Sequence, residues 1–177
     1  MWRPKLVEDT LEMKQLADCI SNFCRDFEDF NRKKPLLLLS GIIGTGKTRI
    51  ARQLYRRASG IGVDCWFHGN WPHPPQVCFV RWAEFIESES DGVEQDAREA
   101  DLTILDDIGS ETDRYKSGAP MDKLCQLLGA REGKFTLLTS NIHLEEWATR
   151  DARLADRLLR RGQRFEIRNT LSFQQRA

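Results

Sequence analysis

One short segment, GIIGTGKT at residues 41–48, constrains the fold of this chain more than any other part of its sequence. It directly follows LLLLS at residues 36–40, a wholly apolar run of the kind found in buried parallel strands. After the segment, apolar residues recur at helical spacing until a Ser-Gly pair at residues 59–60. The segment is therefore predicted to connect a buried strand to a helix.

This segment fits the pattern G-x-x-x-x-G-K-[ST], the P-loop, in the strand-to-helix context that the pattern requires. Its glycines allow conformations in which successive backbone N–H groups face one anion, and the helix N-terminus adds its positive end. Lys47 is predicted to contact the β- and γ-phosphates of ATP, and the Thr48 hydroxyl to bind Mg²⁺. The predicted nucleotide-binding residues are Gly41, Ile42, Ile43, Gly44, Thr45, Gly46, Lys47, Thr48 and Arg49.

A second apolar run, LTILDDIG at residues 102–109, ends in two carboxylates. We predict that Asp106 emerges at the tip of a buried strand and holds Mg²⁺. Asp107 would then orient or deprotonate the water that attacks the nucleotide. The alternative for the second acid is a helix cap or a loop carboxylate.

A third run, KFTLLTSN at residues 134–141, ends in Thr139, Ser140 and Asn141. A neutral polar side chain here can hydrogen-bond the γ-phosphate and the water, although ordinary strand-end turns use the same residues. In open parallel sheets, ligands bind at the carboxyl ends of the strands. The three polar clusters are therefore predicted to form one site.

The remaining pattern predicts an α/β domain of three layers, α/β/α, around a mainly parallel sheet. Further strands are expected at residues 77–82 and 163–169. Helices are expected from residue 83, at 121–133, and in two pieces over 144–162. Apolar residues between Met13 and Phe30 at spacings of three and four predict an amphipathic helix that packs on this domain, although a partner helix could use the same stripe. We divide the chain into an N-terminal helix at 1–33 and a core at 34–177.

Composition narrows the class of protein. No apolar run approaches the roughly 20 residues of a membrane span, and the N-terminus shows no secretory signal. Five cysteines without a CxxC pair favour free thiols and a cytoplasmic location. The net charge is zero, yet residues 150–177 hold eight arginines and three acids. That segment is either a solvated face or a surface for phosphates, of DNA or of a neighbour's nucleotide.

The ordered motifs GIIGTGKT, LTILDDIG, LLTSN and ARLADRL resemble the AAA+ ATPases of the DnaC/IstB group over about residues 35–170. That group comprises helicase loaders and the ATPase helpers of transposases. The resemblance implies Mg²⁺-dependent ATP hydrolysis, with Asn141 as the sensor-1 residue. It also implies that Arg157, or else Arg153, is an arginine finger that enters the site of a neighbouring subunit, and hence that the chain forms a homo-oligomer.

The resemblance further implies DNA and a helicase or transposase as partners. The sequence departs from the group in three respects. Asp107 stands where the group often has glutamate. Residues 1–34 precede the predicted first strand, where helicase loaders usually carry a helicase-binding domain, and the chain leaves no room for a C-terminal lid after the last strand. An AAA+ core without a lid domain is therefore expected. Two alternatives remain open: a small P-loop kinase, and a switch that binds ATP and hydrolyses little of it.

Overall fold

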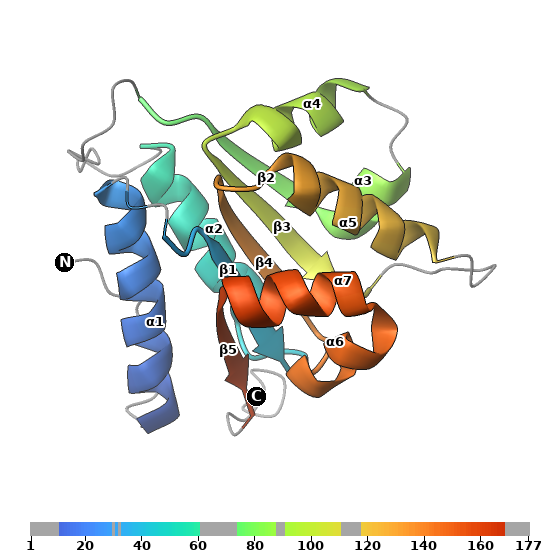
Figure 1. Cartoon of the computed structure of the whole chain (residues 1–177). Helices are drawn as coiled ribbons and strands as arrows, with labels where there is room; N and C mark the ends of the chain where they lie inside the picture. The colour runs from blue at the N-terminus through green and yellow to red at the C-terminus, as the bar shows by residue number, and fades with distance from the viewer. Residues whose placement is uncertain are drawn as a thin grey trace.

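A computed structural model of the chain describes residues 11–29, 31, 33–60, 74–87, 91–110 and 118–168. These residues contain a five-stranded sheet in the order β2-β3-β4-β1-β5, with every neighbouring pair parallel (Figure 1). The strands are β1 (Leu36–Gly41), β2 (Val77–Arg81), β3 (Leu102–Ile108), β4 (Phe135–Ser140) and β5 (Gln163–Ile167). The predicted parallel sheet is confirmed.

Helices cover both faces of the sheet, which confirms the predicted three layers (Figure 1). One face carries α1 (Leu11–Glu28) and α2 (Lys47–Ala58). The other carries α3 (Trp82–Glu87), α4 (Asp91–Glu99), α5 (Ala119–Ala130), α6 (Leu144–Arg150) and α7 (Ala152–Ala155), which continues into the π-helical turn η1 (Asp156–Arg161).

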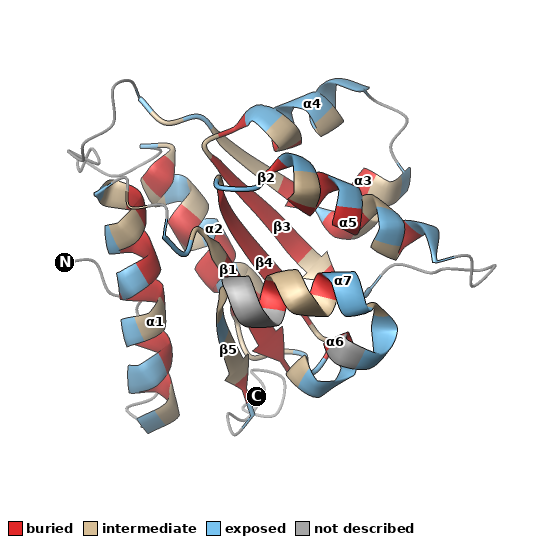
Figure 2. Ribbon diagram, viewed as in Figure 1, coloured by how far each residue is buried: buried red, intermediate tan, exposed pale blue. Residues whose placement is uncertain are grey.

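The leucine run in β1 is explained by this double covering. Successive side chains of a strand point to opposite faces. Leu37 and Leu39 accordingly pack in the core beneath α1 and α2, whereas Leu38 packs in the core beneath α5 and α7. All three are fully buried, and the central strands β1, β3 and β4 are buried along most of their length (Figure 2). A strand with two apolar faces must read as a continuous apolar run.

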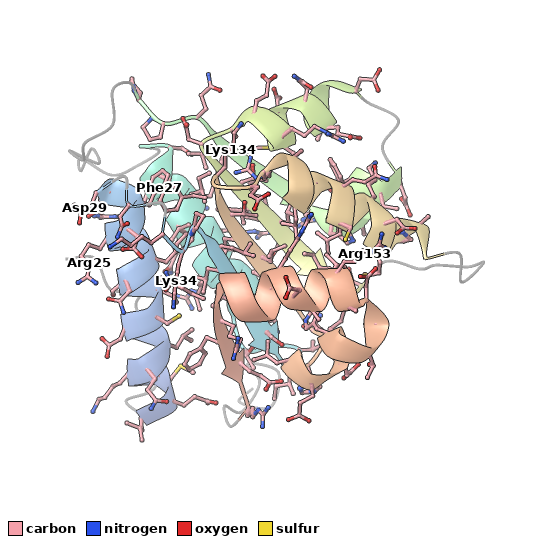
Figure 3. The ribbon with its side chains drawn as sticks, in the orientation of Figure 1. Arg25, Phe27, Asp29, Lys34, Lys134 and Arg153 are labelled. Carbon is pink, nitrogen blue, oxygen red and sulfur yellow. The ribbon has the colours of Figure 1, made fainter. Side chains whose placement is uncertain are left out.

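The amphipathic helix predicted near the N-terminus is α1, and its apolar stripe faces the sheet. Phe27 packs edge-on against Phe135 of β4, with ring centroids 5.1 Å apart (Figure 3). Glu28, at the end of the helix, forms an ion pair of 3.1 Å with Arg57 of α2. The buried members of the stripe are Met13, Leu16, Ile20, Phe23 and Phe27. In this structure the stripe is thus covered by the chain itself, and the boundary between residues 33 and 34 stays a prediction.

The helical connections match the expected order with one addition. The helix expected from residue 83 is α3, but a further helix, α4, follows it and was not predicted. The two pieces expected over 144–162 are α6 and α7 with η1. They separate at Asp151, whose carboxylate accepts hydrogen bonds from the backbone N–H groups of Arg153 and Leu154 and so caps α7.

Two further features concern what the described residues lack. The last element among the described residues is β5, and these residues include no lid domain. None of the helices in the described part is both long and apolar enough to cross a bilayer.

Candidate nucleotide-binding site

The predicted phosphate-binding loop connects β1 to α2 at the carboxyl edge of the sheet. Gly44 and Gly46 have φ angles of 82° and 90°, a region that favours glycine. Gly41, with a φ of 130°, is needed for a second reason as well, because a Cβ atom there would lie 2.3 Å from the carbonyl oxygen of Ile167 in β5. Gly46 directly precedes Lys47, the first residue of α2. The strand, loop and helix that the motif requires are all present.

Lys47 folds back into this loop. Its Nζ donates hydrogen bonds to the carbonyl oxygens of Gly41 (2.8 Å) and Ile42 (2.7 Å), and the residue is only 6% exposed. Burial lowers the pKa of Lys47 to about 8, although the nearby carboxylates of Asp107 and Asp106 act in the opposite direction. A phosphate bound in the loop would favour the charged ammonium in the same way as these carboxylates do.

The two acids at the end of β3 diverge. The pairing of β3 with β4 shifts register between Leu105 and Ile108, and Asp107 has a φ of 65°. An irregularity of this kind re-aims the side chains at a strand end. Asp106 is 2% exposed, whereas Asp107 is half-buried. The neighbouring carboxylates therefore have different surroundings and different partners.

Thr139 and Asn141 provide those partners from the end of β4. The Thr139 hydroxyl donates a hydrogen bond to Oδ1 of Asp106 (2.7 Å) and accepts one from the backbone N–H of Asp107 (2.8 Å). Nδ2 of Asn141 donates to Oδ1 of Asp107 at 2.8 Å. The structure thus brings the predicted residues Asp106, Asp107 and Asn141 together. The bridging position of Thr139 follows from strand register, which the sequence does not reveal.

Two buried serines tie the neighbouring strand ends together. The Ser140 hydroxyl donates to the carbonyl oxygen of Ile108 (2.7 Å) and accepts from the backbone N–H of Ile142 (3.0 Å). The Ser40 hydroxyl, at the end of β1, donates to the carbonyl oxygen of Ile142. Both serines are fully buried. The ends of β1, β3 and β4, which carry the predicted site, are consequently fixed relative to one another.

Thr48 and Asp106 line one cleft of about 270 Å³ beside the loop. Hydroxyl and carboxylate oxygens are suitable ligands for Mg²⁺, which usually keeps waters and substrate phosphates as its other ligands. The two residues therefore fit the predicted magnesium site. The remaining residues of the cleft are Arg52, Arg81, Trp82, Ala83, Glu84, Asp107 and Ser110.

Arg52 and Arg81 are the basic residues of this cleft, and the sequence analysis did not predict either of them. Arg52 lies one helical turn after Thr48, so its presence on the same side of α2 could have been read from the spacing. Arg81 ends β2 and pairs in register with Asp106 of β3. That pairing depends on the strand order, which only the structure supplies.

Arg157 does not join the other predicted catalytic residues of its own chain. Its Nη1 donates a hydrogen bond to the carbonyl oxygen of Cys125 in α5 (2.7 Å). The guanidinium lines a second cavity, of about 280 Å³, together with Leu36 and Thr136. These two residues begin β1 and β4, whereas the P-loop follows the other end of β1, about 16 Å away along the strand. Arg157 therefore lies away from its own chain's P-loop, and its predicted role in the site of a neighbouring subunit stays a prediction.

Three members of the arginine-rich segment, Arg150, Arg153 and Arg168, are paired with carboxylates of the chain itself. Arg150 pairs with Glu146 at 3.3 Å, and Arg168 pairs with Glu145 at 3.1 Å. Arg153, which extends from α7 towards α5, pairs with Asp122 and Asp151, both at 2.8 Å (Figure 3). The hydrogen bond from Arg153 is the largest of the causes that lower the pKa of Asp151 to about 2. The side chains of Arg160, Arg161 and Arg176 lie outside the described residues.

Comparisons with known proteins identify structures with the same fold. No protein-family model and no curated protein sequence matches the chain. Solved structures do match the chain, among them the following three. The replication initiator DnaA bound to AMPPCP and single-stranded DNA has a TM-score of 0.66, 15% identity, and coverage of 91% of this chain and 48% of its own. The DnaC helicase loader has a TM-score of 0.63 and 16% identity, and the match covers 94% of this chain and 93% of the DnaC chain. DnaI has a TM-score of 0.59, 20% identity, and coverage of 90% and 86%.

The extent of these matches differs between the relatives. The chain spans about half the length of the DnaA chains, but most of the length of the DnaC and DnaI chains. At 15–20% identity the likeness is one of fold. In this chain that fold consists of the parallel sheet, the flanking helices and the loop between β1 and α2. The chain therefore has the P-loop AAA+ fold of DnaA, DnaC and DnaI, and the resemblance to the DnaC group drawn from its motifs is confirmed at the level of the fold.

Proposed function

We propose that this protein binds and hydrolyses ATP with Mg²⁺ and couples its nucleotide state to assembly on DNA or on a DNA-bound partner. One observation carries the hydrolysis: hydrogen bonds from the end of β4 hold both acids of β3 next to the P-loop. Thr139 fixes Asp106, and Asn141 fixes Asp107. A site for phosphate hydrolysis needs this combination of a phosphate cradle, a metal ligand and a group that orients water.

Each residue then has a distinct role. The backbone N–H groups of the loop and the ammonium of Lys47 bind the β- and γ-phosphates. Thr48 and Asp106 would hold Mg²⁺, which would supply positive charge next to the phosphate oxygens. Asp107 orients the attacking water and accepts its proton, while the amide of Asn141 keeps that carboxylate in position. The aspartate reaches one methylene less far than a glutamate.

The proposed arginine finger acts between subunits. Arg157 lies near the amino ends of the strands, whereas its own P-loop lies at their carboxyl ends. It can therefore reach a nucleotide only on another copy of the chain. Presenting it requires the hydrogen bond to Cys125 to break. Arg153 is the second candidate, since its side chain is 66% exposed but held by two aspartates. An arginine finger is worth about 10³–10⁵ in rate, so hydrolysis should depend on oligomerisation.

The proposed partners come from the proteins with the same fold. One of the matched structures is a replication initiator bound to single-stranded DNA, and another is a helicase loader. A helicase or a transposase on DNA is therefore the class of partner that we propose, in the manner of the DnaC/IstB group. The cytoplasm is the location in which such partners and ATP occur together.

The test is ATP hydrolysis by the wild type, Lys47→Ala and Arg157→Ala over a range of protein concentrations, with and without single- and double-stranded DNA. We expect wild-type activity per subunit to rise with concentration and to respond to DNA, and both variants to lose it. Mixing the two inactive variants should restore part of the activity, because an intact P-loop can then meet an intact Arg157. Lys123→Ala is a matched control for both variants, because it also removes a cation, but from α5 and outside the proposed site.

Two results would contradict this proposal. The first is ATPase activity per subunit that depends neither on protein concentration nor on Arg157. It would contradict the proposal that Arg157 acts in the site of a neighbouring subunit. The second is ATP binding without turnover under all conditions, which would favour a nucleotide-binding switch.

A small P-loop kinase is the second candidate, and the cleft beside Thr48 favours it. A kinase needs a pocket for the phosphoryl acceptor next to the γ-phosphate, with cations around it. The cleft of about 270 Å³ contains Arg52 and Arg81 in such a position. Incubation with γ-labelled ATP distinguishes the two functions, because an ATPase releases all label as inorganic phosphate whereas a kinase transfers it to an added acceptor.

A further inference from the structure

The helix that begins at the P-loop carries a row of arginines on its outer side. Ile50, Ala51 and Leu54 form the inner side of α2 and are buried. Arg49, Arg52 and Arg56 are exposed, and their spacing of three and four residues places them on one face of the helix. The helix, KTRIARQLYRRA, contains no acidic residue. We call Arg49, Arg52 and Arg56 the α2 arginine row.

Within the part of the chain that the structure describes, these arginines have no acidic partner, in contrast to three arginines near the C-terminus. Arg150, Arg153 and Arg168 each form an ion pair with a carboxylate of the same chain. Among the residues that the structure describes, no side chain forms an ion pair or a hydrogen bond with the α2 arginine row. The positive charge of the row is thus available to a ligand, whereas carboxylates of the same chain compensate the charges of Arg150, Arg153 and Arg168.

Helix stability does not explain the row. Arg49 lies in the first turn of α2, where the helix dipole disfavours a cation. Arg52 and Arg56 are four residues apart, a spacing at which like charges destabilise a helix. Only Arg56, near the C-terminus of the helix, is favoured by the dipole. The sequence retains two unfavourable placements of charge, which points to an external anion.

The chemistry of the row favours a chain of phosphates over an acidic protein. Seven residues of helix span about 10 Å, which corresponds to about three phosphates of one DNA strand. The planar guanidinium groups suit the bidentate binding of phosphate oxygens. A protein interface needs apolar or aromatic residues at its centre, whereas the exposed large apolar residues of the described chain are Leu11, Ile42, Ile43 and Val93, none of them on α2.

We propose that the α2 arginine row binds the phosphate backbone of a DNA strand. This inference rests on the proposed function in so far as that function includes DNA, and it names the surface that the strand contacts. It also replaces the arginine-rich segment at 150–168, which the sequence suggested for this role. Because α2 begins at Lys47, one helix would hold the nucleotide phosphates at its start and the DNA backbone along its outer side.

The experiment measures DNA affinity by fluorescence anisotropy over a salt series, with a labelled single-stranded 30-mer and the matching duplex, in the presence of AMPPCP. The test variants are Arg56→Gln and the double variant Arg52→Gln/Arg56→Gln. Arg49 is left intact because it belongs to the predicted nucleotide-binding segment. The control, Arg150→Gln/Arg168→Gln, removes the same charge from two paired arginines. Circular dichroism checks that each variant is folded.

Each lost phosphate contact reduces the slope of log K against log salt by about 0.7 for single strands and about 0.9 for duplex. We expect Arg56→Gln to lower the slope by one such step, the double variant by two, and the control by none. The form of DNA with the larger affinity identifies the ligand. Since Arg56 does not line the nucleotide cleft, its variant separates DNA binding from any effect on ATP.

Three outcomes would overturn the inference without contradicting the proposed ATPase activity. The first is an unchanged slope in the double variant while the wild type binds DNA. The second is equal competition by polyglutamate and by unlabelled DNA, which would assign the row to acidic polymers in general. If the wild type binds no DNA at all, the row loses its proposed ligand. Concentration-dependent ATP hydrolysis, measured separately, would then still support assembly with a protein partner.

Discussion

Replacing Thr139 by valine tests whether the end of β4 holds the acids of β3 in place. Valine keeps the shape of the side chain and removes the hydroxyl that bridges Asp106 and the backbone N–H of Asp107. Thr139 is 1% exposed, so water cannot replace the hydroxyl easily. A hydrogen bond to a charged group is worth about 1.5–3 kcal/mol, and a buried donor without a partner costs about 1–3 kcal/mol. Since the two losses are not additive, we expect the free energy of unfolding to fall by about 2–4 kcal/mol.

Thr103→Val is the matched control. Thr103 is fully buried in β3, and its hydroxyl donates to the carbonyl oxygen of Ala97 at 2.8 Å, a neutral partner away from the site. Its loss should cost about 1 kcal/mol. Urea denaturation of both variants, with an unchanged slope against urea, measures the difference.

The same substitution should weaken the proposed metal site. Removing a side chain that orients a metal ligand lowers metal affinity by roughly 10–100-fold. A Mg²⁺ titration of ATP hydrolysis should therefore shift to higher Mg²⁺ in Thr139→Val, remain unchanged in Thr103→Val, and return to the wild-type value in Thr139→Ser. If Thr139→Val and Thr103→Val agree in both unfolding energy and Mg²⁺ dependence, the bridging role of Thr139 is refuted.

Two other predictions follow from the loop. Because the pKa of Lys47 lies at about 8 and a bound phosphate raises it, ATP binding near pH 8 should take up a proton, and affinity should fall as the pH rises further. Calorimetry in two buffers of different ionisation heat measures this uptake, and Lys47→Arg, which stays charged, should abolish it; a wild type without uptake would contradict the reasoning. Gly41→Ala should lower the melting temperature far more than Gly60→Ala, because a Cβ atom meets a carbonyl oxygen at 2.3 Å in the first case and nothing within 4 Å in the second. The control should cost about 1–2 kcal/mol for its left-handed backbone, and equal losses would show that β5 moves aside.

Much of the fold could be predicted because it is encoded locally. The leucine run of β1 had to be a strand buried on both faces, and the spacing in α1 had to give one apolar side. Helix α4 was missed although it has a helical spacing of charges, since it buries only Ala97 and therefore carries a weak apolar pattern. The break between α6 and α7 was anticipated, and the structure assigns it to the cap formed by Asp151.

The sequence by itself determined the P-loop, the acid pair and the polar strand end, because each is a contiguous motif whose conformation depends on its own residues. Tertiary structure alone decided which of these groups touch. Strand order and register place Thr139 beside Asp106. The path of the chain after β4 places Arg157 near the amino ends of β1 and β4, away from the P-loop. The same holds for charge. A count of arginines favoured the C-terminal segment, but ion pairing depends on which carboxylates folding brings into contact. Among the described residues, carboxylates pair with Arg150, Arg153 and Arg168 and not with Arg49, Arg52 or Arg56.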